Sequence, residues 1–366
     1  MAKHYYKADF DLQGFQQQTR MLREAACETT DSEATARIIR QILATLNSSH
    51  TTYHAKHSPK RHQMLGIFHA TAFQDLPDSE FIYDGIGIDT RQDDTDVIIT
   101  SVYDGFPAAA AGLRFGDRII AVDNQDFQLG QSFRGRAGTE VLLKIRHGQD
   151  TLEIPVQVEP IDARTMFETA LKASFKIIDH NGMKVAYAHV WSYAGQKYQD
   201  MLKTELLWGE LSKADALILD LRDGYGGASP DYVNLFREPV ATMVGIDREG
   251  NRQHYTGVWG KPVNILINGG STSGKELFAY TFKKLQLGKL VGETTAGAVL
   301  AGRIFLLDNG AVLYLAVSDV LVDGQRLEGR GVAPDIRATA AAAHTNAKDQ
   351  QTQAALNALI PPQEKN

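Results

Sequence analysis

Three short and almost wholly apolar runs constrain the fold of the C-terminal half more than any other feature. They lie at residues 185–190, 216–221 and 263–267, and stretches with helical spacing lie between them. A strand that reads as a continuous apolar run is typical of a sheet covered on both faces. Because strands that alternate with helices build the α/β class, the pattern predicts an α/β core.

A serine lies at the junction that follows the third run. Residues 271–276 read Ser-Thr-Ser-Gly-Lys-Glu, and apolar residues then recur at helical spacing from Glu276 to Lys289, so Ser273 ends a strand-to-helix loop. A helix N-terminus offers unpaired N–H groups and a positive dipole end. A nucleophile that forms an oxyanion needs this setting, although an ordinary helix cap has the same local pattern. Lys275, at the start of the helix, is expected to face solvent.

Three glycines follow the second apolar run, in the sequence Asp-Leu-Arg-Asp-Gly-Tyr-Gly-Gly at residues 220–227. Glycine lets the backbone come close to a ligand and turn its N–H groups toward it. An ordinary tight turn is the alternative interpretation. The loop is not a P-loop, because the Gly-Lys-Ser/Thr element is missing.

Several histidines lie in the polar turn and link that follow the N-terminal region. Residues 9–46 have helical spacing, with Asp31 or Ser32 as a candidate cap. Next comes Ser-His-Thr at residues 49–51, where a histidine beside a serine is a candidate general base. A metal site is the alternative for four histidines, although the His-Glu-x-x-His pattern is absent. They are His50, His54, His57 and His62.

Short strand-like runs replace the helical spacing between residues 81 and 160. Pro155 predicts that the last of these strands, at residues 150–159, lies at a sheet edge, because proline cannot donate to a strand ladder. Residues 107–113 read as a short helix that ends at a glycine. The other strand-like runs lie at residues 85–88, 96–100, 116–122 and 140–145.

Composition excludes several classes of protein. The net charge of −6, with no basic run, argues against a nucleic-acid partner. The apolar stretches are shorter than the roughly 18 residues that a membrane span needs, and the first residues lack the apolar core of a signal peptide. A single cysteine, Cys27, rules out an internal disulfide framework.

The motifs together resemble the tail-specific, or C-terminal processing, serine peptidases over residues 30–337. The resemblance implies a ClpP/crotonase-like ββα core of the α/β class with an inserted PDZ domain and an N-terminal helical region. It rests on four motifs in order: Asp-Leu-Arg-x-x-x-Gly-Gly at 220–227, Ser-x-Ser-x-x-Glu at 271–276, Gly-Glu-x-Thr-x-Gly at 292–297 and Glu-Gly-x-Gly-x-x-Pro-Asp at 328–335.

One position separates two branches of this family. The processing branch has a lysine base where this chain has Ala298, whereas the tricorn-like branch has a Ser-His-Thr motif, present here as residues 49–51. The resemblance therefore implies a tetrad of Ser49, His50, Ser273 and Glu328. His50 would take the proton of the nucleophile Ser273, and Glu328 would act through Ser49.

The resemblance also implies two binding elements. The N–H of Gly274 and one N–H from Gly226 or Gly227 would form the oxyanion hole. Residues 81–160 resemble a PDZ domain, in which a peptide adds as a strand and its terminal carboxylate is held by a loop. That loop would comprise Gly85, Ile86, Gly87 and Ile88. A PDZ domain that serves only as a lid or spacer is the alternative.

These observations predict four parts. They are an N-terminal helical region carrying Ser49 and His50 (1–80), a PDZ domain (81–160), an α/β peptidase core (161–340), and a tail (341–366) that forms a frayed helix and a loose end.

We expect a serine endopeptidase that cleaves unfolded or loosely folded polypeptides, captured through apolar C-termini, without metal or cofactor. The resemblance implies a periplasmic or extracellular location, while the sequence leaves the cytoplasm and a homo-oligomer open. A catalytically silent scaffold that binds a hydrophobic ligand or partner is the alternative function. A zinc hydrolase using His50, His54 and His57 is a third.

Overall fold

The chain forms two compact units in the computed structural model, which describes residues 3–93, 96–128, 130–339 and 349–359. The first unit comprises residues 1–169 and 297–330, and the second comprises residues 170–296 and 331–366. The first unit thus contains a segment that returns from far along the chain.

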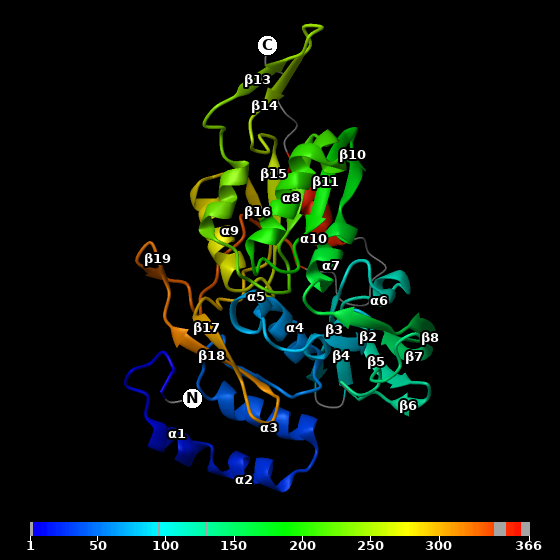
Figure 1. Ribbon diagram of the computed structural model, residues 1–366, viewed down its shortest axis with the longest axis vertical. Helices are drawn as coiled ribbons and strands as arrows, with labels where there is room; N and C mark the ends of the chain where they lie inside the picture. Colours follow the sequence, from blue (N-terminus) through cyan, green and yellow to red (C-terminus); the bar gives the residue numbers. More distant parts are fainter. Residues whose placement is uncertain (1–2, 94–95, 129, 340–348, 360–366) are drawn as a thin grey trace. The chain divides into compact units, whose positions relative to one another are not determined.

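Three helices open the first unit (Figure 1): α1 (Leu12–Gln18), α2 (Arg20–Glu28) and α3 (Ser32–Ala44). The carboxylate of Asp31 accepts hydrogen bonds from the N–H groups of Glu33 and Ala34, which confirms Asp31 as the cap of α3. Leu43 of α3 is buried in one cluster with Leu300 and Leu315. The N-terminal helices therefore share a core with the returning segment.

The returning segment forms a three-stranded sheet in the order β1-β18-β17. Its strands are β1 (Thr52–His54), β17 (Ala301–Leu306) and β18 (Val312–Ser318), and a small hairpin of β19 (Leu321–Val322) and β20 (Gln325–Arg326) follows. Thr52 pairs with Tyr314 across β1 and β18. Between β1 and the next sheet lie α4 (Pro59–Ile67), α5 (His69–Ala72) and the short helix η1 (Asp78–Glu80).

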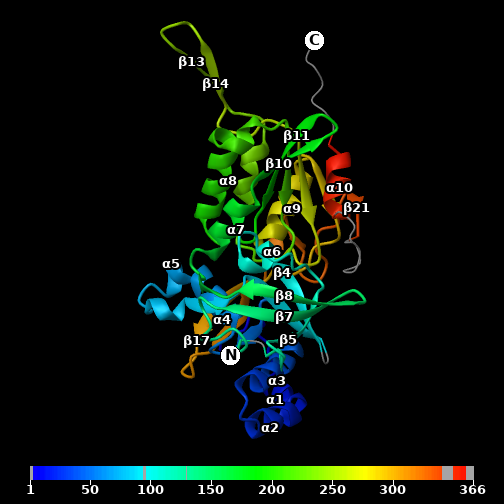
Figure 2. The same cartoon turned by 90° about the vertical axis from the view of Figure 1, so that its right-hand side faces the viewer.

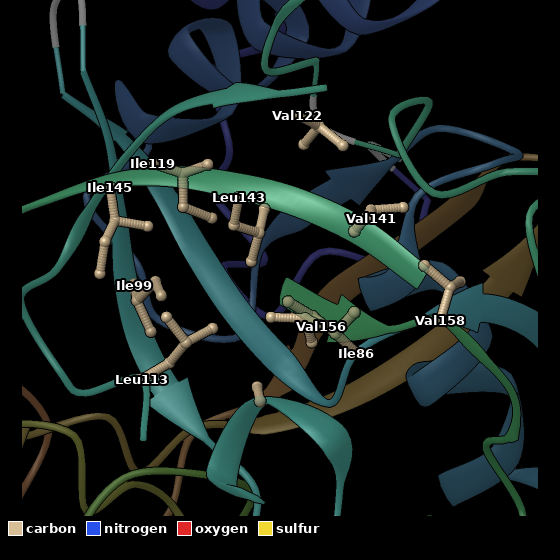
Figure 3. Packing of buried hydrophobic residues seen from close by; sticks show 11 residues of the cluster. Ile86, Ile99, Leu113, Ile119, Val122, Val141, Leu143, Ile145, Val156 and Val158 are labelled. Atoms are coloured by element: carbon tan, nitrogen blue, oxygen red, sulfur yellow. The ribbon is translucent and has the colours of Figure 1, made fainter. Parts of the chain in front are cut away.

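The predicted run of short strands forms a sheet in the order β3-β4-β5-β7-β8, with β6 paired to β5. β8 contains Pro155 and lies at the end of this order, which confirms it as an edge strand. Figure 3 shows the aliphatic side chains that fill the core of this region, among them Ile99 and Leu143. The elements are β2 (Ile82–Gly85), β3 (Ile88–Asp93), β4 (Asp96–Val102), α6 (Pro107–Ala110), β5 (Arg118–Val122), β6 (Gln125–Asp126), β7 (Glu140–His147), β8 (Asp150–Gln157) and β9 (Glu159–Asp162), the last paired with β2.

The second unit follows α7 (Met166–Ser174) and has a six-stranded sheet in the order β10-β11-β12-β15-β16-β21. All neighbours are parallel except β10 and β11. Every residue of β12 and β15 is buried, so the prediction of strands covered on both faces is confirmed. The strands are β10 (Lys176–His180), β11 (Met183–His189), β12 (Ala216–Asp220), β15 (Val263–Ile267), β16 (Lys289–Gly292) and β21 (Ile336–Arg337).

Helices cover this sheet, and Figure 2 shows α8 and α10 on opposite sides of it. A two-stranded arm also projects from the unit (Figure 1). The remaining elements are α8 (Gln196–Trp208), η2 (Glu210–Lys213), η3 (Pro230–Phe236), the arm strands β13 (Met243–Ile246) and β14 (Arg252–Tyr255), α9 (Gly274–Lys284) and α10 (Gln350–Asn357). Among the described helices, none has the length and apolar character that crossing a membrane requires.

Two predictions about helices were wrong. The helix after Ser273 begins at Gly274 and ends at Lys284, five residues before the predicted end, and Gln286 just beyond it has a φ of 53°. The tail was predicted to be frayed, but α10 packs on the sheet through Ala355 and Leu356, both buried with Val291. The rest of that tail, residues 341–348 and 360–366, lies outside the described residues.

Candidate functional site

Ser49 and His50 lie in the turn between α3 and β1, in the first unit. His50 has a φ of 54°, and Asn47 at the start of the turn has a φ of 46°. A histidine in the left-handed region is uncommon, and backbone strain of this kind persists only where the surroundings hold it. The turn therefore presents the His50 ring in an imposed orientation.

A hydrogen-bonded chain connects Glu328 to His50 through Ser49. The Glu328 carboxylate accepts from the Ser49 Oγ at 2.9 Å and from the Ser49 N–H at 3.0 Å, and Ser49 Oγ lies 2.9 Å from His50 Nδ1. A carboxylate is an acceptor only, so the single hydroxyl proton of Ser49 goes to Glu328. Ser49 Oγ must then accept from an Nδ1–H, which leaves the Nε2 of a neutral His50 with a lone pair. This is the tautomer that a general base requires.

Electrostatics favour the same protonation states. Burial lowers the pKa of His50 below its ordinary value of 6.5, against an opposing effect of the Glu328 charge. Burial alone would raise the pKa of Glu328, but hydrogen bonds from Ser49 and from the N–H groups of Val299 and Leu300 hold it below its usual value. A neutral histidine and an ionised glutamate therefore coexist near neutral pH.

Two residues support this turn that sequence reasoning missed. The Tyr314 ring, on β18, lies 5.5 Å from the His50 ring between centroids. Thr51 Oγ1 accepts from the Ala316 N–H at 3.3 Å and so ties the turn to the same strand. Thr51 could have been found, because it belongs to the Ser-His-Thr motif. Nothing in the sequence around Tyr314 indicates that this residue contacts His50.

Ser273 lies between the end of β15 and the start of α9, in the second unit, as predicted. Its φ of 57° and ψ of −125° are a strained conformation for a residue with a side chain. Its N–H donates to Glu276 Oε2 at 3.1 Å, and Thr295 Oγ1 donates to the other oxygen of Glu276 at 2.6 Å. Glu276 and Thr295 thus hold the backbone of Ser273, and both occur in the sequence motifs without having been assigned this role.

The glycine loop of residues 222–227 packs against Ser273. A Cβ atom added to Gly226 would lie 2.5 Å from the Ser273 Cβ, and one added to Gly274 would lie 2.6 Å from the Gly227 nitrogen. Such distances exclude any side chain at these two positions, so the glycines are required for the close approach.

The orientation of two peptide groups in this loop bears on the oxyanion hole. The N–H of Tyr193 donates to the carbonyls of Tyr225 and Gly226, at 3.3 and 3.1 Å. Because C=O and N–H point in opposite directions in a trans peptide, the N–H groups of Gly226 and Gly227 turn away from Tyr193. Within the described part of the chain, neither of them, nor the N–H of Gly274, donates a hydrogen bond.

Lys275 was predicted to face solvent, and this prediction is wrong. Its side chain is fully buried, and its Nζ donates to the carbonyl oxygen of Asp223 at 2.5 Å. The helical position alone suggested exposure, but the glycine loop covers it.

A cavity of about 370 Å³ lies over the predicted carboxylate loop, and Gly85, Ile86, Gly87 and Ile88 all line it. Its walls also include Phe127, Phe133 and Arg134 from the loop before β7. Thr90 lines the cavity too, and its hydroxyl is buried without a hydrogen-bond partner among the described residues. The lining therefore combines apolar side chains with polar and charged groups, among them Asp84 and Arg134, that a ligand can satisfy.

A further wall of this cavity comes from His57, Pro59 and His62, around the start of α4. A buried carboxylate docks α4 there, because Asp89 on β3 accepts hydrogen bonds from Lys60, from Gln63 at 3.0 Å and from Tyr103 at 2.6 Å. The segment just after the Ser49–His50 turn thus contributes to the cavity, which sequence reasoning missed.

The predicted residues fall into two groups. The first unit brings Ser49, His50 and Glu328 together, and the second brings together Ser273 and the glycines at 226, 227 and 274. Among the described residues, no group of three His, Cys, Asp or Glu side chains is arranged to hold a metal ion.

Two family models match the chain. One, described as peptidase family S41, matches residues 184–338, and the other, described as a PDZ domain, matches residues 85–158. These matches confirm the resemblance to the C-terminal processing serine peptidases and the predicted class of fold.

Similar proteins include the carboxy-terminal processing protease CtpB of Bacillus subtilis, which is 25% identical over 81% of this chain and 61% of that protein. A "Probable CtpA-like serine protease" of Staphylococcus haemolyticus is 24% identical over 69% of this chain and 52% of that protein. The chain therefore spans only part of the length of these relatives. The crystal structure of the tricorn protease shares the fold, with a TM-score of 0.55 and 19% identity over 98% of this chain and 35% of that one.

Proposed function

This chain contains a peptidase family S41 domain and a PDZ domain, and on that premise we propose that it is a serine endopeptidase that cleaves unfolded or loosely folded polypeptides. The observation that carries the proposal is the hydrogen-bonded chain from Glu328 through Ser49 to His50. A solvated surface histidine has no need of such a chain, whereas a general base does.

In the proposed mechanism, Ser273 is the nucleophile and His50 the base. His50 Nε2 takes the Ser273 hydroxyl proton as Oγ attacks the peptide carbonyl, and returns it to the leaving amine as the C–N bond breaks. Water then attacks the acyl-enzyme, again with His50 as base. Glu328 acts through Ser49, keeping the proton on Nδ1 and stabilising the imidazolium that forms.

The negative charge on the carbonyl oxygen is held by backbone N–H groups. We assign one of them to Gly274, at the start of α9, and the other to Gly226 or Gly227. Support comes from the close packing of Gly226 on Ser273 and from the N–H groups that turn away from Tyr193. These donors are built into the backbone, so no reorganisation is needed during the reaction.

Substrate capture is assigned to the PDZ domain. A peptide would add as a strand along β3 with its terminal carboxylate at the loop of residues 85–88, and an apolar last side chain would enter the 370 Å³ cavity. The domain organisation and the location belong to the same proposal. We propose four parts, divided at residues 80, 160 and 340, and a location outside the cytoplasm.

Digestion of casein by the wild type and by Ser273→Ala, with products identified by mass spectrometry, tests the proposal. We expect cleavage by the wild type only. Ser318→Ala, which removes an exposed serine on β18, serves as a control and should cleave like the wild type. Equal cleavage by wild type and Ser273→Ala would show that Ser273 is not the nucleophile.

A catalytically silent scaffold remains the second candidate, and the observation that favours it is the group of apolar side chains in the cavity over residues 85–88. Such a protein would cleave no substrate and would carry a hydrophobic ligand through purification. Extraction with organic solvent followed by mass spectrometry distinguishes it from a peptidase.

A further inference from the structure

Lys275 occupies a position that is unfavourable for a lysine on two counts. It lies in the first turn of α9, where the positive end of the helix dipole repels a cation, and its side chain is fully buried. Among the described residues, it forms no ion pair that would compensate. Lys275 therefore has two energetic costs, from the helix dipole and from burial, and it lies two positions after the proposed nucleophile. We expect a role in the protein that offsets these costs.

The contacts of Lys275 reach two other segments. Its Nζ donates to the Asp223 carbonyl oxygen at 2.5 Å and lies 3.5 Å from the Trp191 carbonyl oxygen. The Trp191 oxygen also accepts from the N–H of Tyr225 at 2.7 Å. One ammonium group therefore joins the start of α9, the glycine loop of residues 222–227 and the segment that follows β11.

The glycine loop has left-handed backbone at the place where Lys275 holds it, and this conformation strains Asp223. Asp223 has a φ of 51°, and Gly224 has a φ of 74° with no room for a Cβ, which would lie 2.0 Å from the Trp191 oxygen. Strained backbone needs surrounding contacts that over-determine it. Asn268 supplies another such contact, because its Nδ2 donates to Asp223 Oδ1 at 3.1 Å.

The charge of Lys275 is balanced by carboxylates at a distance and not by a direct ion pair among the described residues. Burial lowers the pKa of Lys275 to about 7, while the carboxylates of Asp223 and Asp220 oppose this shift. Asp220 is itself paired with Arg222. An amine in either protonation state has at least two N–H donors, which suffices for two carbonyl acceptors.

We propose that Lys275 is a positioning residue, which fixes the glycine loop against Ser273 so that the N–H of Gly226 or Gly227 that serves the oxyanion hole stays in place. The inference rests on the proposed function, because it takes Ser273 as the nucleophile. It adds a residue that does not touch the substrate and acts only through the backbone of residues 191 and 223.

Lys275→Met is the direct test, since methionine fills similar volume but removes the Lys275 donor from both carbonyls and leaves the Trp191 oxygen only the N–H of Tyr225. We expect kcat to fall about 10- to 100-fold, less than the roughly 100- to 1000-fold that removal of a whole oxyanion donor costs, with KM changed less than about threefold. Affinity for a peptide aldehyde, which forms a tetrahedral adduct, should fall in parallel with kcat. Affinity for the cleaved product peptide should not change.

Lys284→Met is the matched control, because Lys284 lies on the same helix with an exposed side chain. It should leave kcat and aldehyde affinity at wild-type values. A folded Lys275→Met with wild-type kcat would overturn the inference. A loss as complete as that of Ser273→Ala, with His50→Ala still active, would make Lys275 the base and overturn it too.

Amide hydrogen exchange on the wild type keeps the inference testable if Lys275→Met does not fold. We expect the amides of Asp223 and Tyr225, which donate to Asn268 Oδ1 and to the Trp191 carbonyl oxygen, to be protected as strongly as that of Leu277 in α9. Exchange of the loop at the rate of open chain would overturn the inference. Loss of all activity in Ser273→Ala tests the proposed function separately, so the two failures are distinguishable.

Discussion

The carboxylate of Glu328 receives two hydrogen bonds from Ser49, a residue 279 positions earlier in the chain. The same carboxylate also accepts from the N–H groups of Val299 and Leu300. Four donors on one side chain hold it ionised and in place. The proposed base, His50, thus depends on a residue that no local feature of the sequence pairs with it.

His50→Ala should lower kcat/KM by at least about 10³-fold, because it removes the proposed general base. The melting temperature should stay within a few degrees of the wild type. Turnover of an unstructured substrate, measured beside a thermal melt, checks both expectations. Activity near the wild-type level would exclude His50 as the base.

Activity should persist to a lower pH than a solvent-exposed histidine would allow. His50 acts as a base only when neutral, and its pKa lies below 6.5 in the folded protein, so the acid limb of kcat/KM should fall below pH 6.5. Glu328→Gln changes the opposing charge and should shift that limb further down, with a lower plateau. A pH profile of kcat/KM measures both, and a limb above pH 6.5 would contradict the assignment.

Peptides that end in an apolar residue with a free carboxylate should bind the cavity beside β3. Phe133→Ala removes part of its apolar wall and should weaken binding by about 5- to 30-fold, as expected for the loss of about 1–2 kcal/mol of apolar contact. Fluorescence anisotropy with a labelled peptide measures this. Equal affinity for the same peptide with an amidated C-terminus would contradict carboxylate recognition.

Leu356→Ala should lower the free energy of unfolding by about 2–5 kcal/mol, because Leu356 is buried on the sheet of the second unit. Gln353→Ala, in the same helix, is the control and should change stability by less than about 0.5 kcal/mol. Urea denaturation compares the two variants. Similar small effects of both would mean that α10 frays in solution.

Much of the fold could be predicted from the sequence because it depends on local periodicity. The apolar runs of β12 and β15, the cap at Asp31 and the edge position of Pro155 each follow from a pattern within a few residues. Helix ends were predicted less well, since the end of α9 depends on how the chain turns after Lys284.

The features of the candidate site also fall into two groups, those that the sequence indicates and those that only the tertiary structure decides. The order of motifs along the chain determined the class of fold and indicated Ser273, His50, Ser49 and Glu328 as candidates. Only the tertiary structure decided that Lys275 is buried, that Tyr314 packs on His50 and that α10 covers the sheet. Burial and hydrogen-bond partners depend on segments distant in the sequence, and local spacing carries no information about which of those segments meet.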